Sequence, residues 1–275
     1  AYLARMNWWT VEYGLIGDIN NPKIYGAGLL SSVGESQNCL SRKVKKIPFS
    51  LDCINTSYDI TEPQPQLFVA PNFGKLSDVL EEMADRMAFR LGGTEGLIKA
   101  KDAATVCTAE YDSKIQISGI LKNIILDEDR NPAYLQYDGP TQISRYGNEF
   151  DSHGGDYHSQ GFGSPVGNVK GFYKPLCDFN DDDIKTMNLN VGETIEISFV
   201  SGVLLSGELA NILEDNGRIL ILSFDNCTVS LGDDLLFLPE WGMYDMACGG
   251  IITSVYGGPA DYENYKHYLP DDKPK

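Results

Sequence analysis

The chain has 275 residues, of which 42% are hydrophobic, enough for a buried core in one large or two modest domains. Its net charge of −17 argues against nucleic-acid and membrane-surface partners, because phosphate backbones and acidic lipids are also negative. Six cysteines lie far apart without a C-x-x-C pair, which argues against a zinc site and a compact disulfide framework. With no membrane-length apolar run and no signal peptide, we expect reduced thiols in a cytoplasmic protein.

A helix is predicted at the start of the chain, over residues 2–13. Apolar side chains recur there at helical spacing, and Gly14 and Gly17 can end the helix. Glu12 then lies in the last turn among aromatic side chains, where the helix dipole disfavours a negative charge. A carboxylate in apolar surroundings is costly unless it is protonated, hydrogen-bonded or bound to a cation. We therefore expect a cation or a missing segment opposite Glu12; the alternative is a glutamate at a helix end that reaches water.

A glycine-rich segment follows, in which Gly26 and Gly28 permit close approach of the backbone to Glu12. We expect a turn over 18–22, short strands over 23–27 and 67–70, and extended structure without a helix over 49–66. The strongest helical pattern covers residues 77–91, with Ser77 as its N-cap and Gly92-Gly93 as its end. A second short helix is expected over 94–104.

Four blocks of this region carry a family resemblance. Trp8-Trp-Thr-Val-Glu-Tyr-Gly-Leu15, Tyr25-Gly-Ala-Gly-Leu-Leu-Ser-Ser32, Gly34-Glu35 and Gln64-Pro-Gln-Leu-Phe-Val-Ala70 follow one another in this order. Together they resemble the second half of the catalytic domain of the pterin-dependent aromatic amino acid hydroxylases. The resemblance covers about residues 1–92, a third of the chain. For bacterial members with a long C-terminal region it would extend over nearly all of it.

The resemblance implies roles for individual residues. In the family, two histidines and one carboxylate hold iron and leave open positions for oxygen chemistry. Glu12 matches the carboxylate ligand, and Trp8 matches an aromatic side chain of the substrate pocket. The remaining matches lie along the substrate or support an iron-ligating histidine from outside the coordination sphere: Gly28, Ser31 and Ser32, with Glu35 as a further acidic group near the site.

The chain departs from the family in its histidines. Both family histidines come from a His-Glu-x-x-x-His helix upstream of the Trp-Thr-Val-Glu block, and this chain opens instead with Ala1-Tyr-Leu-Ala-Arg5. The resemblance thus implies the C-terminal part of a monooxygenase that uses Fe(II), tetrahydropterin and O2 to hydroxylate phenylalanine or a related aromatic amino acid. We expect this part to need the upstream segment and to be inactive alone.

Another pair of histidines repeats the spacing of that motif, in His153-Gly-Gly-Asp-Tyr-His158. In the family a helix presents the two rings to the metal. Here glycines and Pro165 flank the pair and predict a loop. We therefore interpret it as a polar loop with two hydrogen-bonding histidines rather than a metal site.

Short β-rich runs separated by turn residues begin near residue 106 and predict an all-β unit, a small barrel or sandwich. Two hairpins within it look alike, one containing Ile117-Ser-Gly-Ile-Leu121 and the other Leu205-Ser-Gly-Glu-Leu209. Convergent hairpin composition is the alternative. Farther on, Glu240 and Asp245 could form an acid/base pair, although packing is the preferred interpretation.

The predicted fold class is α+β: a helical part of a hydroxylase domain over 1–104, a β-rich domain over 105–260 and a loose tail over 261–275. A rival hypothesis makes the β-rich domain a non-catalytic regulatory or oligomerisation module, and the sequence leaves a homo-oligomer open.

Overall fold

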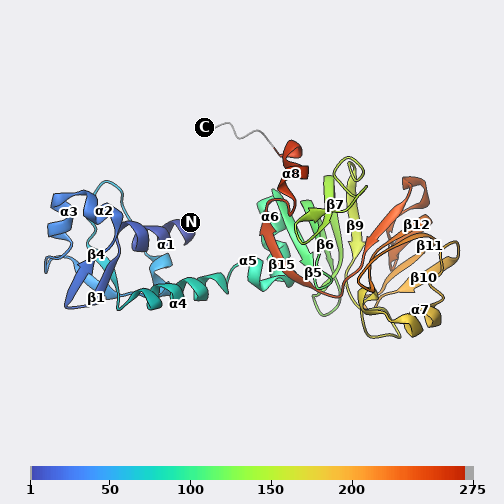
Figure 1. Ribbon diagram of the computed structural model, residues 1–275, viewed down its shortest axis with the longest axis horizontal. Helices are drawn as coiled ribbons and strands as arrows, with labels where there is room; N and C mark the ends of the chain where they lie inside the picture. Colours follow the sequence, from blue (N-terminus) through green and yellow to red (C-terminus); the bar gives the residue numbers. More distant parts are fainter. Residues whose placement is uncertain (1, 270–275) are drawn as a thin grey trace. The chain divides into compact units, whose positions relative to one another are not determined.

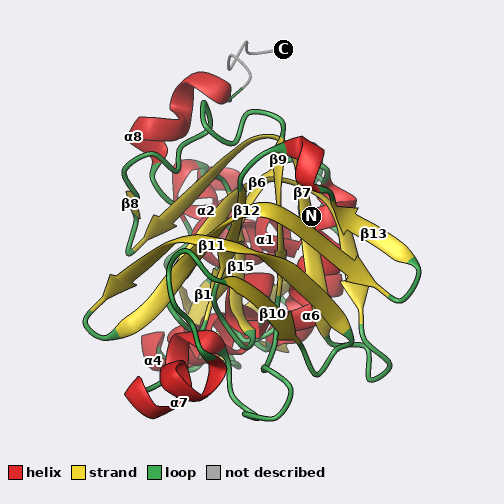
Figure 2. Cartoon of the chain, turned by 90° about the vertical axis from the view of Figure 1, so that its right-hand side faces the viewer, coloured by secondary structure: helices red, strands yellow, loops and turns green. Residues whose placement is uncertain are grey.

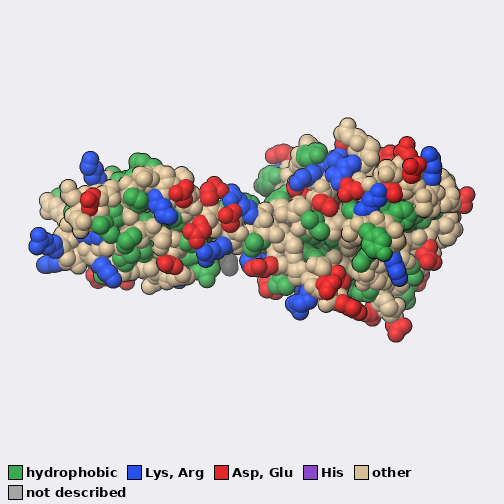
Figure 3. Space-filling view, turned by 90° about the horizontal axis from the view of Figure 1, so that it is seen from below, with side chains coloured by type: hydrophobic (Ala, Val, Ile, Leu, Met, Phe, Trp, Pro, Cys, Tyr) green, Lys and Arg blue, Asp and Glu red, His purple; other side chains and the backbone are tan. Residues whose placement is uncertain are grey.

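The computed structural model describes residues 2–269 and divides into two compact units on either side of the Arg86–Met87 peptide bond. Both units combine helices with open sheets. The helices in the described part of the chain are all too short or too polar to cross a bilayer. Figure 3 shows acidic and basic side chains interspersed on the face that it draws, without a single large patch of either sign.

The first unit holds a four-stranded mixed sheet with helices. In the order β2-β1-β4-β3, β1 and β2 are antiparallel, and β4 is parallel to both β1 and β3. Its elements are α1 (Tyr2–Asn7), the π-helical turn η1 (Trp8–Glu12), β1 (Leu15–Asp18), β2 (Asn21–Ile24), α2 (Ala27–Ser31), α3 (Val33–Asn38), β3 (Lys45–Pro48), the 3-10 helix η2 (Leu51–Asn55), β4 (Gln66–Ala70) and α4 (Phe73–Ala84). The prediction of no helix over 49–66 is wrong at η2, whose Leu51, Cys53 and Ile54 enter the core.

The long helix predicted over 77–91 is wrong in its bounds. Helix α4 begins four residues earlier, because Asn72 has an extended backbone and its Oδ1 accepts a hydrogen bond from Lys75 N at 2.9 Å. Ser77, the predicted cap, lies inside the helix. An extended Met87 then separates α4 from α5 (Ala88–Leu91). The predicted end at Gly92-Gly93 is present: Gly92 has a φ of +54°, and a Cβ there would lie 2.5 Å from the Ile252 carbonyl oxygen.

The second unit is built mainly from two antiparallel sheets (Figure 2). The first contains β5 (Val106–Tyr111), β6 (Ile115–Leu126), β7 (Pro132–Arg145), β8 (Asn148–Glu149), β9 (Gly161–Pro165) and β15 (Ile252–Gly257). The second contains β10 (Thr194–Ser198), β11 (Val203–Asp215), β12 (Arg218–Leu231), β13 (Asp234–Phe237) and β14 (Tyr244–Ala247). Its helices are α5, α6 (Gly93–Ala103), α7 (Asp181–Met187) and α8 (Tyr262–Tyr265). The β-rich character was predicted correctly, but neither sheet closes into a barrel among the described residues.

The two sheets repeat one strand arrangement. Cys107 pairs with Gly119 between β5 and β6, and Ile195 pairs with Gly207 between β10 and β11, so both partners are 88 positions farther on. The hairpins β6–β7 and β11–β12 also have register shifts at matching places, after residues 118, 121 and 125 and after 206, 209 and 213. Each first shift falls on the glycine of the Ser-Gly pair. A Cβ there would approach the neighbouring strand to within 3.0 Å at Gly119 and 3.1 Å at Gly207, which explains why both hairpins contain glycine.

The sheets meet where β9 lies beside β14. The hydroxyl of Ser164 accepts a hydrogen bond from Ala247 N at 3.0 Å and donates one to Ala247 O at 3.1 Å. Tyr244 on β14 and Tyr134 on β7 are also hydrogen-bonded through their hydroxyls, at 3.3 Å. All of these groups are buried. The meeting line is therefore fixed by polar contacts inside an otherwise apolar interior.

The tail predicted to be loose is ordered over residues 261–269. Asp261 caps α8 by accepting from Asn264 N, and the buried Tyr265 donates to the Pro140 carbonyl oxygen at 2.6 Å. The part of the predicted tail over 270–275 lies outside the described residues. The proposed domain boundary after residue 104 stays a prediction. Helix α6, which precedes this boundary, packs its buried Leu97 into the core of the second unit, against the sheet that contains β5 and β6.

The helix cap generates a stability prediction. Asn72→Ala should lower the free energy of unfolding of the first unit by about 1 kcal/mol, because Lys75 N loses its partner. Ser77→Ala, the matched control, should change it little, since Ser77 is exposed and bonds only to its own helix. Urea denaturation followed by tryptophan fluorescence in a Trp241→Phe background reports on Trp8 and Trp9 alone. Equal losses in the two variants would contradict the assigned cap.

Candidate active site around Glu12

A π-helical turn places Glu12. Tyr13 N donates to Trp8 O at 2.8 Å, five residues back, in place of the four-residue spacing of an α-helix. Inside this turn Trp9 and Thr10 are buried, and the Thr10 hydroxyl donates to Met6 O at 2.6 Å. Glu12 is the last residue of the turn and is half-buried. The sequence predicted a helix here but not the extra residue in its last turn.

Glycines bring α2 against this turn, as the sequence predicted. A Cβ on Gly26 would lie 2.5 Å from both Glu12 O and Gly14 N. A Cβ on Gly28 would lie 3.1 Å from Glu12 Oε2 and 3.0 Å from the Tyr13 ring. The carboxylate of Glu12 therefore faces the backbone of α2 at a distance that leaves no room for a larger side chain.

Aromatic rings stack at the start of the same turn. Trp8 stacks between Tyr13 and Tyr58, with ring centroids 4.5 and 4.3 Å apart. Its indole Nε1 is buried without a hydrogen-bond partner in the described structure. Tyr58 was missed by the sequence analysis, because it lies in an irregular segment far along the chain and no periodicity marks it.

The other predicted site residues lie around the same turn. Ser31 is exposed and donates to Gly28 O at 2.8 Å, and Ser32 Oγ accepts from Glu35 N at 3.3 Å as the N-cap of α3. Burial raises the pKa of Tyr13, and the negative charges of Glu35 and Glu12 raise that pKa further. The phenol thus lies within the field of both carboxylates. These contacts bring the predicted residues together, while their roles toward substrate and metal stay predictions.

A complete iron site is not present in the first unit. The chain has three histidines, and all of them lie beyond residue 150. Glu12 therefore offers one carboxylate without imidazole partners among the described residues of this unit. A divalent transition metal needs more donors than this, so the unit by itself does not fit the iron that the family resemblance implies.

His153 and His158 lie in a loop between β8 and β9, as predicted. Their rings are hydrogen-bonded, with 3.2 Å between His153 Nδ1 and His158 Nε2. Burial lowers the pKa of both imidazoles, that of His158 to about 3. The sequence analysis did not connect this pair with Asp245, which lies beside it. Glu240 and Asp245 do not resemble an acid/base pair, because Glu240 is exposed on the 3-10 helix η4 (Pro239–Trp241) and Asp245 is buried on β14.

Comparison with known proteins identifies the first part of the chain. Residues 1–95 match the model of the biopterin-dependent aromatic amino acid hydroxylases. This segment is similar to that family. Hereafter residues 1–95 are called the hydroxylase segment.

Curated relatives of the hydroxylase segment are enzymes named phenylalanine-4-hydroxylase. The one from Dictyostelium discoideum is 43% identical over 84 residues, which are 30% of this chain and 19% of the relative. The human enzyme is 43% identical over 83 residues, 30% of this chain and 18% of the relative. The Vibrio cholerae enzyme is 40% identical over 78 residues, 28% of this chain and 27% of the relative. The chain thus spans less than a third of each of these three relatives.

Solved structures of the Chromobacterium violaceum phenylalanine hydroxylase also match. The structure with iron and phenylalanine bound is 38% identical, with a TM-score of 0.26, and the match covers 31% of this chain and 35% of that one. The cobalt-bound structure is 39% identical, with a TM-score of 0.27, and the match covers 30% of this chain and 34% of that one.

The contact between Gly28 and Glu12 can be tested by substitution. Gly28→Ala should destabilise the first unit by about 1–3 kcal/mol, since the new methyl group meets the Glu12 carboxylate and the Tyr13 ring. Gly34→Ala is the matched control: its nearest neighbour would be Ser32 Oγ at 3.8 Å, and alanine is the better helix former there. Fluorescence-detected unfolding measures both. A Gly28→Ala protein as stable as the wild type would contradict the close approach.

Proposed function

We propose that the hydroxylase segment supplies the carboxylate ligand and part of the substrate pocket of an iron- and tetrahydropterin-dependent monooxygenase that hydroxylates phenylalanine with O2. One observation carries the proposal. Glu12 ends a π-helical turn, against Gly28 and beside the stacked Trp8, in a segment about 40% identical to phenylalanine-4-hydroxylases. π-turns are frequent at functional sites, where they reorient a side chain at a cost in helix geometry.

The proposed roles follow from the positions of the side chains. Glu12 provides one oxygen ligand, held in place by the tightly packed backbone of α2. Trp8 lies in a stack of three aromatic rings with Tyr13 and Tyr58, and the edge of this stack offers an apolar wall for a substrate ring. Gly28 faces Glu12 and Tyr13, Ser31 and Ser32 follow it at the end of α2, and the charge of Glu35 acts on Tyr13. When bound, iron and the pterin supply the activation of O2.

The imidazole ligands must come from protein outside this unit. Large apolar side chains are exposed on η1 and on the two helices that contact it, α1 and α2: Leu3 is 59% exposed, Val11 56% and Leu30 61%. Such side chains gathered near a half-buried carboxylate favour a surface that further polypeptide covers. We therefore propose that the chain alone does not hydroxylate, and that it acts together with a segment carrying two histidines.

A cytoplasmic location belongs to the same proposal. Among the described residues all six cysteines are free and buried, and burial raises the pKa of Cys53 and Cys227 to about 12. Unpaired, unreactive thiols suit a reducing compartment.

The rival function concerns the second unit. This unit has its own cores and a duplicated strand arrangement, which supports an independent module over about 105–260. A regulatory or oligomerisation role for it is compatible with hydroxylation by the parent protein, so the two functions do not exclude each other.

A chimera tests the catalytic proposal without knowledge of flanking sequence. The hydroxylase segment replaces the matching segment of the Vibrio cholerae phenylalanine-4-hydroxylase, and phenylalanine hydroxylation and bound iron are measured. We expect an active, iron-containing chimera. Glu12→Gln should lower the activity of the chimera more than about 100-fold and deplete its iron. Losing a residue that only hydrogen-bonds a metal ligand costs about 10- to 100-fold, and losing the ligand itself should cost more.

The matched control is Glu62→Gln, an exposed carboxylate in the same segment, which should leave activity and iron unchanged. Hydroxylation that persists in a folded Glu12→Gln chimera would refute the ligand assignment.

A further inference from the structure

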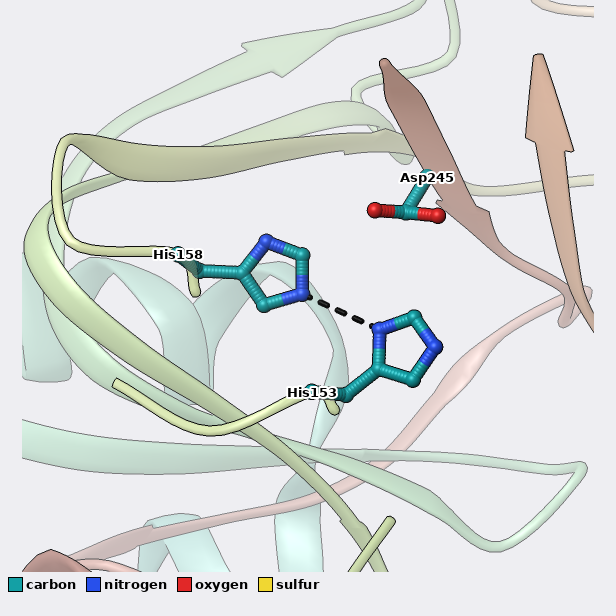
Figure 4. Close-up of side chains that lie close together, drawn as sticks. All are labelled: His153, His158 and Asp245. Atoms are coloured by element: carbon teal, nitrogen blue, oxygen red, sulfur yellow. Dashed lines mark hydrogen bonds between the residues drawn. The ribbon is translucent and has the colours of Figure 1, made fainter. Parts of the chain in front are cut away.

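Three buried side chains converge in the second unit. His153 and His158 come from the loop between β8 and β9, and Asp245 comes from β14 of the other sheet (Figure 4). One donor atom from each lies within 4.8 Å of the others, and all three residues are at most 9% exposed. These residues are called the His153–His158–Asp245 cluster below. It lies where β9 meets β14, a line fixed by the Ser164–Ala247 hydrogen bonds.

The spacing of the two rings suits a metal. His153 Nδ1 and His158 Nε2 are 3.2 Å apart. Two imidazole nitrogens bound to one metal at about 2.1 Å, with an angle of about 100°, are also about 3.2 Å apart. A metal can therefore replace the hydrogen bond between the rings without driving the nitrogens apart. Hydrogen bonds fix the backbone of both residues, since His153 N bonds to Phe150 O and His158 N to Gly154 O.

The charge of Asp245 is the second argument. The residue is 5% exposed, and a buried carboxylate is costly unless it is protonated, hydrogen-bonded or paired with a cation. Its Oδ1 accepts a hydrogen bond from Ser223 at 2.6 Å, and no lysine or arginine forms an ion pair with it among residues 2–269. Two other polar groups feel its charge: the phenol of Tyr157, which is neutral, and the imidazole of His153, whose pKa is lowered by burial. A hydroxyl orients the carboxylate but does not offset its charge, which a bound cation would do.

A cavity gives access to the cluster. It has a volume of about 530 Å³, and both His158 and Asp245 line it. The rest of its wall is largely aromatic, including Tyr157, Phe237 and Trp241. Two imidazoles and one carboxylate leave coordination positions open, and here these positions would face a space large enough for water or a small organic molecule.

From this arrangement we infer that the His153–His158–Asp245 cluster binds one divalent first-row transition-metal ion, such as Zn²⁺, Co²⁺ or Fe²⁺. The donor set of two nitrogens and one oxygen favours these ions over Mg²⁺ and Ca²⁺, which prefer oxygen ligands. The site is separate from Glu12 and does not depend on the proposed hydroxylase function.

Cobalt titration of the full chain tests the inference. The purified protein is stripped with a chelator and titrated with Co²⁺ alone, and binding is followed by visible absorption and by metal analysis after dialysis. We expect one equivalent of saturable Co²⁺, displaced by Zn²⁺, with X-ray absorption that shows imidazole ligands. Asp245→Asn and His158→Gln should each weaken binding more than about 10-fold, the smallest loss usual for a perturbed metal site.

His267→Gln is the matched control, because His267 is exposed and remote in sequence from the cluster. This variant should bind Co²⁺ as tightly as the wild type. Circular dichroism verifies folding; if His158→Gln does not fold, the near-isosteric Asp245→Asn and the wild-type X-ray absorption decide. The inference is overturned if the wild type binds no stoichiometric metal, or if folded Asp245→Asn binds it as tightly as the wild type. A metal lost in Glu12→Gln but kept in Asp245→Asn would overturn it as well.

Discussion

One backbone hydrogen bond, from Tyr13 N to Trp8 O, determines where the first unit places the carboxylate of Glu12. It closes a π-helical turn, so that Trp9 and Thr10 enter the core while Glu12 remains at its edge. The glycines of α2 then fit against this turn, where any side chain would collide with it. The π-helical turn, the close packing of α2 and the half-buried carboxylate therefore depend on one another.

The second unit depends on a different constraint, a glycine bulge that occurs once in each of its two sheets. In each sheet a glycine bulge lets a long hairpin bend, and the matching registers 88 positions apart make the two arrangements equivalent. The two sheets differ in the residue that pairs with Leu135 in one and with Ser223 in the other. Ser164 lies opposite Leu135, and Asp245 lies opposite Ser223, again 88 positions on from Leu135. One repeat therefore places a hydroxyl where the other places a buried carboxylate, and only the latter meets two imidazoles.

Local features of the fold could be predicted from the sequence, and long-range ones could not. The helix before Glu12, the glycines that approach it and the two Ser-Gly hairpins all leave a pattern within a few residues. The stacking of Tyr58 on Trp8 and the approach of Asp245 to His153 join segments that are far apart in the chain, so no periodicity reveals them. The π-turn was missed because helical spacing does not distinguish it from an α-turn. Asn72 was missed because Ser77 stands closer to the strongest apolar stripe.

The central claim is that the carboxylate of Glu12 completes a metal site whose imidazoles lie outside the first unit. The most direct measurement is an anomalous diffraction map at the iron edge, from crystals of the hydroxylase chimera that carries residues 1–95. The account predicts an iron peak at bonding distance from a Glu12 oxygen, with Gly28 beside it and two histidines of the host enzyme completing the set. An iron peak with Glu12 turned away into solvent would contradict it.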